Sequence, residues 1–215
     1  ANLTPEKQSR NLRAEQDLLQ ILDNLPDGLF TMDGAGRINY FNAAAEQITG
    51  LTATEAMGMQ CKEVLNSPSC DTDCPLKGTM RTGEDVYNRE LTLIGKDGKE
   101  IPTICSFSRL RGQDGRVIGG MEVFIDISDR KRLENDLKLS ERKYRRIFEG
   151  SKDMILIISK EGTVKDVNQA GVELLGYGGK QELLALRSVE EIYDNPKHWQ
   201  VFRKQIHRDG FFKDF

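Results

Sequence analysis

The chain has 215 residues, of which 38% are hydrophobic and 30% charged, and its formal net charge is −3. This length allows one or two domains with ordinary cores, and the interspersed charges argue against a broad nucleic-acid-binding face, so we expect no direct nucleic-acid partner. No segment approaches the ~20 consecutive apolar residues of a membrane helix. No signal peptide is visible, so we expect a cytoplasmic protein without a membrane segment in this fragment.

The first predicted elements are a helix and a β-hairpin. Leu18, Leu22 and Leu25 share one stripe of a helix predicted around residues 15–24. Strands are then predicted for residues 29–32 and 37–41, joined by the turn cluster Asp33-Gly34-Ala35-Gly36. Asn42 is placed to cap the start of a helix that Gly50 closes.

Three longer strands are predicted in the second half of this domain. Glycine turns at residues 96–99 and 113–116 separate strands over residues 85–93, 100–108 and 117–125. Asp126-Ile127-Ser128-Asp129-Arg130 follows the last strand directly. It opens a long helix.

Residues 128–149 contain no Gly or Pro and are rich in Leu, Glu, Lys and Arg, which favours one continuous helix. A heptad seam runs along it at Leu133, Leu137, Ser140, Tyr144 and Ile147. Two interpretations are open: the helix packs on its own domain, or it pairs in a homodimer and transmits motion. We expect the second, with a relay through Asp126, Ile127, Arg130, Leu133, Leu137 and Tyr144.

The opening of this domain recurs 126 residues later without a gap. Asp27, Gly36, Asn42, Ala44 and Gly50 recur as Asp153, Gly162, Asn168, Ala170 and Gly176. A repeat of this length implies two similar domains in series. The hairpin, the Asn-x-Ala helix start and the Asp-Ile-Ser-Asp-Arg exit resemble the PAS family of sensory domains.

The resemblance implies an α+β fold of two PAS-like domains, each an antiparallel β-sheet flanked by short helices, joined by a long signalling helix. Residues 1–17 are expected to form a helical lead-in, 18–127 the first domain, 128–149 the linker helix and 150–215 the second domain. By the repeat, the second domain lacks its last strands, so we expect the natural protein to continue into an output domain.

All four cysteines, Cys61, Cys70, Cys74 and Cys105, lie in the first copy. Pro75 suits the first position of a helix, so Cys74 or Asp73 is expected at the cap, where a thiolate is favoured. Cys105, on a predicted strand, could face the same pocket. Three readings stay open: inert buried thiols, a metal or iron–sulfur site at Cys61, Cys70 and Cys74, or a redox switch.

Haem and flavin have less support. The first copy has no histidine, and His198 and His207 of the second copy lie on a predicted helix, where packing or surface roles are commoner than ligation. The segment from Gly58 to Lys62 resembles the flavin-binding motif of the light-oxygen-voltage subgroup, but Gln60 replaces its asparagine.

The sequence carries no phosphate-binding loop, nucleophile elbow or zinc-protease motif, so we expect no catalytic activity in this fragment. The PAS resemblance implies a sensory, dimeric module of a bacterial signalling protein, such as a two-component system, that detects a small molecule or a redox cue. Its output would be a histidine kinase, a cyclic-dinucleotide enzyme or a sigma-54-type regulator. The alternative is a structural relay tandem without a ligand of its own.

Overall fold

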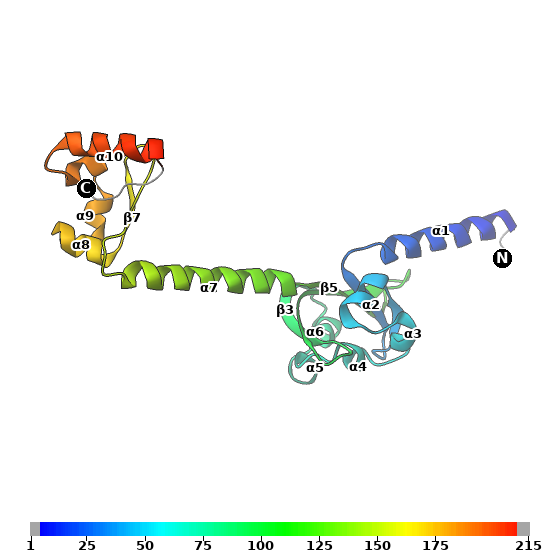
Figure 1. Cartoon of the computed structure of the whole chain (residues 1–215). Coiled ribbons are helices and arrows are strands. Elements are labelled where there is room, and N and C mark those ends of the chain that lie inside the picture. Colours follow the sequence, from blue (N-terminus) through cyan, green and yellow to red (C-terminus); the bar gives the residue numbers. More distant parts are fainter. Residues whose placement is uncertain (1–4, 210–215) are drawn as a thin grey trace. The chain divides into compact units, whose positions relative to one another are not determined.

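The structure, a computed structural model, describes residues 5–209 and divides into two compact units that separate at Glu134 and Asn135. The division falls inside α7 (Ser128–Gly150), one 23-residue helix that confirms the helix predicted over residues 128–149 (Figure 1). Each unit has a hydrophobic core of its own.

A five-stranded antiparallel sheet forms the centre of the first unit, in the order β2-β1-β5-β4-β3. The predicted strands are confirmed with small differences at their ends, and the observed bounds are β1 (Gly28–Asp33), β2 (Ile38–Phe41), β3 (Val86–Ile94), β4 (Glu100–Arg111) and β5 (Val117–Asp126). In the central strand β5, Glu122 lies opposite Phe30 of β1 and Phe107 of β4. Opposed residues share a face, so this carboxyl points to the same side as two core aromatic rings.

Short helices cover that face of the sheet (Figure 1). They are α2 (Ala43–Thr49), α3 (Ala53–Ala56), α4 (Cys61–Leu65), α5 (Ser69–Thr72) and α6 (Pro75–Thr82). The core between helices and sheet includes the buried side chains of Phe30, Ile38, Phe41, Val64, Leu76, Leu93, Phe107 and Phe124. The helix α1 (Pro5–Asp23) precedes this arrangement and joins the described part of the helical lead-in expected over residues 1–17 to the helix predicted around residues 15–24.

The second unit repeats the opening of the first. A two-stranded sheet of β6 (Leu156–Ile158) and β7 (Val164–Val167) is followed by α8 (Gln169–Leu175), α9 (Lys180–Leu184), the 3₁₀-helix η1 (Val189–Ile192) and α10 (Pro196–Asp209). Val164, Val189 and Trp199 form one part of its core. The strand expected to begin at residues 210–215 lies outside the described residues.

One buried asparagine holds three segments of the first unit together through four hydrogen bonds. The Oδ1 atom of Asn42 accepts hydrogen bonds from the backbone N–H groups of Leu29 (2.8 Å) and Ala45 (2.9 Å). Its Nδ2 atom donates to the carbonyl oxygens of Leu22 (3.1 Å) and Asp27 (2.9 Å). The end of α1, the start of β1 and the start of α2 therefore meet at one side chain.

Asn168 makes the same four bonds at equivalent positions of the second unit. Its Oδ1 atom accepts from the N–H groups of Ile155 and Gly171, both at 2.9 Å. Its Nδ2 atom donates to the carbonyls of Phe148 (3.0 Å) and Asp153 (2.9 Å). The repeat thus preserves a three-dimensional arrangement, and α7 is fastened to the second unit as α1 is to the first.

Within residues 5–209, no helix combines the length and the apolar content that crossing a membrane requires.

Candidate functional site

Cys70, on α5, and Cys74, the residue before α6, line one cavity and interact through their side chains. Cys74 is the residue before the helix and Pro75 its first residue, as the sequence predicted. The Cys70 thiol donates to the Cys74 sulfur and is the largest cause that lowers the pKa of Cys74 to about 6. The backbone N–H groups of Lys77 and Leu76 and the charge of Lys77 act in the same direction, against burial. Near neutral pH, Cys74 is therefore a thiolate.

Cys70 is held in the protonated thiol state. Its hydrogen bond to Cys74, followed by burial, raises the pKa of the Cys70 thiol well above its usual range. The pair thus combines a nucleophilic thiolate with a protonated thiol that interacts with it. This is the arrangement that a dithiol needs to form an internal disulfide after one sulfur has reacted.

The other two cysteines, the half-buried Cys61 and the buried Cys105, are thiols of low reactivity. Burial raises the pKa of Cys61, the first residue of α4, to about 11. Cys105, on β4, is fully buried, and burial followed by the nearby Glu122 carboxyl raises its pKa further. Its sulfur lies 3.3 Å from the hydroxyl of Thr103. The redox chemistry of this site is therefore concentrated at Cys74 and Cys70.

Glu122 is a site residue that sequence reasoning missed. It lies on β5 with only 2% of its surface exposed. Burial raises the pKa of its carboxyl to about 8, although a hydrogen bond from Cys105 favours the ionised form. The charge of Cys74 raises this pKa further. A buried acid therefore responds to the charge state of the reactive cysteine.

Cys61, Cys70 and Cys74 share one small internal cavity with Glu122, whereas Cys105, which the sequence suggested could face the same pocket, does not line it. The volume of this cavity is about 20 Å³, and its walls include Cys61, Cys70, Cys74 and Glu122 together with Leu65, Leu91, Leu93 and Phe107. That volume is enough for roughly one water molecule. A chemical change at the sulfurs can thus alter the surroundings of the Glu122 carboxyl on β5. A ligand larger than a water molecule would have to displace side chains to enter this cavity.

Across residues 5–209, no three or more His, Cys, Asp or Glu side chains are grouped so that they could hold a metal ion. Cys61, Cys70 and Cys74 do line one cavity, as the sequence suggested. A metal or iron–sulfur cluster there stays a sequence-based prediction without support from this geometry.

The end of β5 is fastened to the first turn of α7. The Oδ1 atom of Asp126 accepts from the N–H of Ser128 at 2.7 Å. Ile127 is buried, its N–H donates to the carbonyl of Pro102 at 2.9 Å, and its carbonyl accepts from Lys131 at 2.9 Å. These bonds connect the end of β5 directly to the beginning of the helix.

The other relay candidates lie on the surface of α7. Arg130 pairs with Glu134 at 2.8 Å along the helix. Leu133 and Leu137 are 66% and 61% exposed, and Tyr144 is 50% exposed. Tyr144 also stacks on the buried ring of Phe148, with ring centroids 5.3 Å apart. The apolar seam predicted from the sequence is thus present and uncovered in the single chain.

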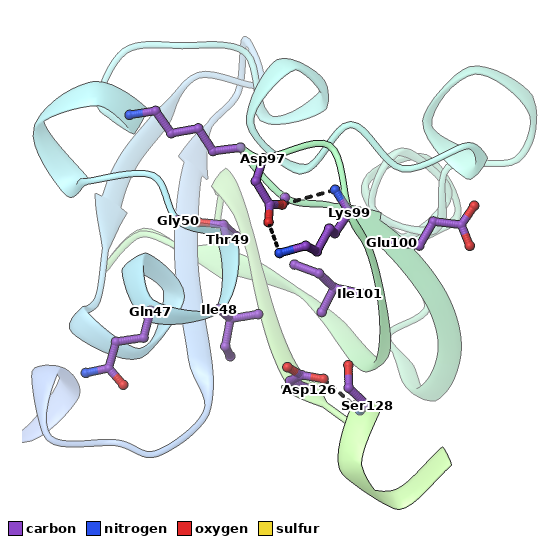
Figure 2. Close-up of a pocket in the computed structure, with 12 residues that line it drawn as sticks. Gln47, Ile48, Thr49, Gly50, Asp97, Lys99, Glu100, Ile101, Asp126 and Ser128 are labelled. Atoms are coloured by element: carbon purple, nitrogen blue, oxygen red, sulfur yellow. Dashed lines mark hydrogen bonds and ion pairs between the residues drawn. The ribbon is translucent and has the colours of Figure 1, made fainter. Parts of the chain in front are cut away.

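A larger hollow lies beside the junction of β5 and α7 and is open to solvent (Figure 2). Its volume is about 510 Å³, and it lies between the end of α2, the β3–β4 turn and the residues Asp126 and Ser128. Asp97 and Lys99 form an ion pair of 2.6 Å at its edge. Their side chains are mostly exposed, so we assign this hollow no chemistry and place the candidate site at the cysteines.

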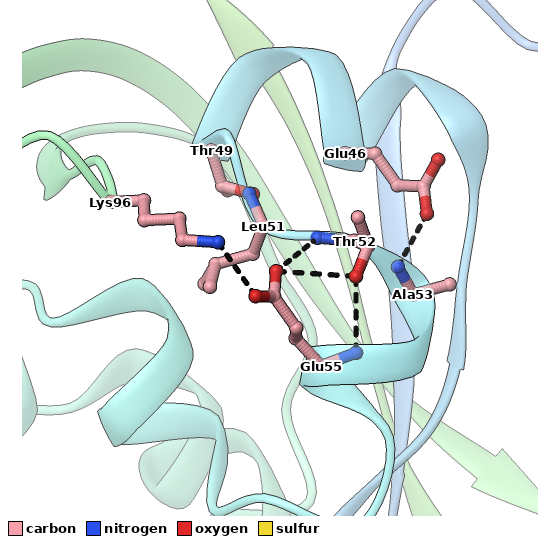
Figure 3. A network of polar contacts seen from close by, with 7 residues as sticks. All are labelled: Glu46, Thr49, Leu51, Thr52, Ala53, Glu55 and Lys96. Atoms are coloured by element: carbon pink, nitrogen blue, oxygen red, sulfur yellow. Dashed lines mark hydrogen bonds and ion pairs between the residues drawn. The ribbon is translucent and has the colours of Figure 1, made fainter.

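Polar contacts hold one wall of this hollow in place (Figure 3). The Lys96 ammonium lies 2.6 Å from the Glu55 carboxylate, which also accepts from the N–H of Thr52 at 3.0 Å. Lys96 is the largest cause that lowers the pKa of Glu55. Glu46 accepts from the N–H of Ala53. These contacts join the β3–β4 turn and α2 to α3, none of them involves a cysteine, and we assign them a structural role.

Comparison with known proteins identifies the same domain twice. Two family models, both described as PAS domain, match residues 26–129 and 142–207. The chain is 28% identical to the signal transduction histidine-protein kinase AtoS of Escherichia coli (strain K12), over 62% of this chain and 21% of the kinase. It is 25% identical to sporulation kinase E of Bacillus subtilis (strain 168), over 87% of this chain and 26% of that kinase.

The chain thus spans about a quarter or less of the length of these two relatives. Among solved structures, the PAS domain of a protein from Colwellia psychrerythraea is similar with a TM-score of 0.48 and 18% identity, over 54% of this chain and 98% of that one.

Proposed function

This chain belongs to the PAS domain family and carries the domain twice, and from that premise we propose that the first domain senses oxidation at Cys70 and Cys74. A sensory role in signal transduction follows from the family and from relatives that include two kinases. The single observation that carries the redox proposal is the thiolate of Cys74 with the Cys70 thiol donating to it.

Oxidation would join the two sulfurs, with loss of two electrons to an oxidant and of the single proton carried by Cys70. The charge of Cys74 would then vanish beside Glu122, whose pKa that charge raises. Because Glu122 lies on β5 and β5 leads into α7, the change would bias the packing of the signalling helix. The proposed output is a histidine kinase, cyclic-dinucleotide enzyme or sigma-54-type regulator outside this chain.

A small neutral oxidant tests the sensing step. We expect diamide to link Cys70 to Cys74, because these sulfurs already share a hydrogen bond. Peptide mapping of the oxidised whole chain by mass spectrometry identifies the link. Cys105→Ser should leave the link intact, and Cys74→Ser should abolish it. If diamide joins no pair, or joins a different one, the redox proposal is wrong and the structural relay tandem is the better account.

We further propose that α7 pairs with α7 of a second copy in a parallel homodimer. The support is the uncovered seam that includes Leu133 and Leu137 at heptad spacing. Changing both to glutamate should weaken association at least about a hundredfold, because each leucine would lose the ~1.5–3 kcal/mol gained by burial.

Sedimentation velocity of the native chain and the variants measures this association. Leu139→Glu is the matched control, because Leu139 is equally exposed on α7 but lies off the seam. We expect dimers for the native chain and the control, and monomers for the double variant. Dimers in all three proteins would show that α7 is not the interface.

A further inference from the structure

A surface groove opens next to the reactive cysteine. Its volume is about 370 Å³, and it is lined by the β1–β2 turn, the start of α4 and the outer side of α6. Met32, Leu76 and Met80 supply its apolar walls, and the glycines of the turn expose backbone. The groove is large enough for a small organic molecule, unlike the internal cavity behind it.

The groove is cationic. Its lining includes Lys62, Lys77 and Arg81 and no aspartate or glutamate. Lys62 pairs with Asp71 at 2.9 Å, whereas Lys77 and Arg81 make no ion pair with any residue that the structure describes. Exposed cations of one sign concentrate anions near them. The electrostatics therefore favour a negatively charged ligand.

The two cysteines of the dithiol differ in which of these two spaces they line. Cys74 lines both the groove and the internal cavity, whereas Cys70 lines the cavity alone. A molecule in the groove can therefore meet Cys74 without meeting Cys70, which can reach Cys74 from the cavity. Cys61 also lines both spaces, but burial raises the pKa of its thiol. The arrangement of Cys74 and Cys70 is the one that disulfide exchange requires of an attacking and a resolving cysteine.

We propose that the groove receives an anionic low-molecular-weight disulfide and that Cys74 and Cys70 reduce it. The proposal rests on the redox function proposed above and names its oxidant. The Cys74 thiolate attacks one sulfur of the ligand, whose S–S bond breaks and releases one thiolate. Cys70 then attacks the sulfur of Cys74, the second thiolate leaves, and the proton of Cys70 passes through solvent to a released thiolate. The ligand gains two electrons, and the protein holds a Cys70–Cys74 disulfide.

The charge of the disulfide is the variable to test. Glutathione disulfide, which is net anionic, and cystamine, which is dicationic, are reacted with the reduced whole chain at low ionic strength. Each rate is divided by the rate of the same disulfide with free cysteine, which removes differences in intrinsic reactivity. We expect a normalised preference for the anionic disulfide of at least about tenfold, and we expect added salt to reduce it.

Arg81→Gln removes a groove cation and should reduce this preference several-fold, whereas Lys99→Gln, on the exposed β3–β4 turn, should not change it. Equal normalised rates for both disulfides would overturn the groove proposal. If diamide still linked Cys70 to Cys74 in that case, the redox function would stand without it. If diamide failed as well, the function itself would be wrong.

Discussion

Replacing Glu122 with glutamine is expected to raise the free energy of unfolding, relative to the native chain, by about 4 kcal/mol more at pH 8.5 than at pH 5. Burial opposite Phe30 and Phe107 raises the pKa of this carboxyl from 4.5 to about 8. The effect is large because a carboxylate in this position has lost its hydration and gains only one thiol as a donor.

The direction follows from proton binding. Between pH 4.5 and about pH 8 the folded chain keeps the Glu122 proton that the unfolded chain loses. The contribution of Glu122 to stability is therefore complete below pH 4.5 and is lost as the pH rises to about 8. Glutamine does not ionise, so the variant escapes this loss.

Urea unfolding of both proteins across this pH range measures the difference. Cys74, whose pKa is lowered to about 6, titrates in the same pH range and has the opposite effect on stability. Because Cys74 is present in both proteins, its contribution largely cancels in the difference between their free energies of unfolding. Glu100→Gln, at the exposed start of β4, is the control and should give a flat difference. A difference between Glu122→Gln and native protein that is independent of pH would mean that Glu122 is ionised at little cost.

Asn168→Ala is expected to lower the free energy of unfolding of the second unit by about 3 kcal/mol. The change removes four side-chain hydrogen bonds at once, of 2.9 to 3.0 Å, although the Gly171 N–H keeps its bond to the Asn168 carbonyl. Two of the backbone partners of these four bonds are the Phe148 carbonyl at the end of α7 and the Gly171 N–H at the start of α8. The variant should therefore also loosen the attachment of α7 to this unit.

The chain offers a built-in probe for this experiment. Trp199 is the only tryptophan and is buried in the core of the second unit, so its fluorescence reports unfolding there. Asn42→Ala is the matched variant, which breaks the equivalent bonds of the first unit and should leave the Trp199 transition in place. A shift below about 1 kcal/mol for Asn168→Ala would contradict the proposed importance of this side chain.

Most of the fold could be predicted because the sequence marks its element ends locally. Asn42 caps α2 and Gly50 ends it with φ of 75°, a conformation that glycine adopts easily, and both residues recur in the second copy. The same local logic placed Cys74 before α6. It did not reveal that Cys70 is the main cause of the low pKa of Cys74, because α5 is a single short turn with no periodicity from which a contact follows.

The burial of Glu122 could not be predicted, because the alternation of apolar and other residues along β5 favours burial of the opposite face. Met121, Val123 and Ile125 are the more apolar set, so pattern reasoning would place them in the core. In the structure Ile125 is exposed, while Glu122 and Phe124 are buried. Pairing with β1 and β4 decides which face is buried, and a single strand does not contain that information.

The measurement that tests the relay most directly is hydrogen exchange of the whole chain in the reduced and the diamide-oxidised state. If oxidation at Cys70 and Cys74 acts on α7, the exchange rates of amides from Glu122 to Lys131 should change, including the Ile127 N–H bonded to Pro102. The Cys70→Ser chain, treated identically, should show no such change. Changes confined to residues 61–82, with β5 and α7 unaffected, would contradict the account.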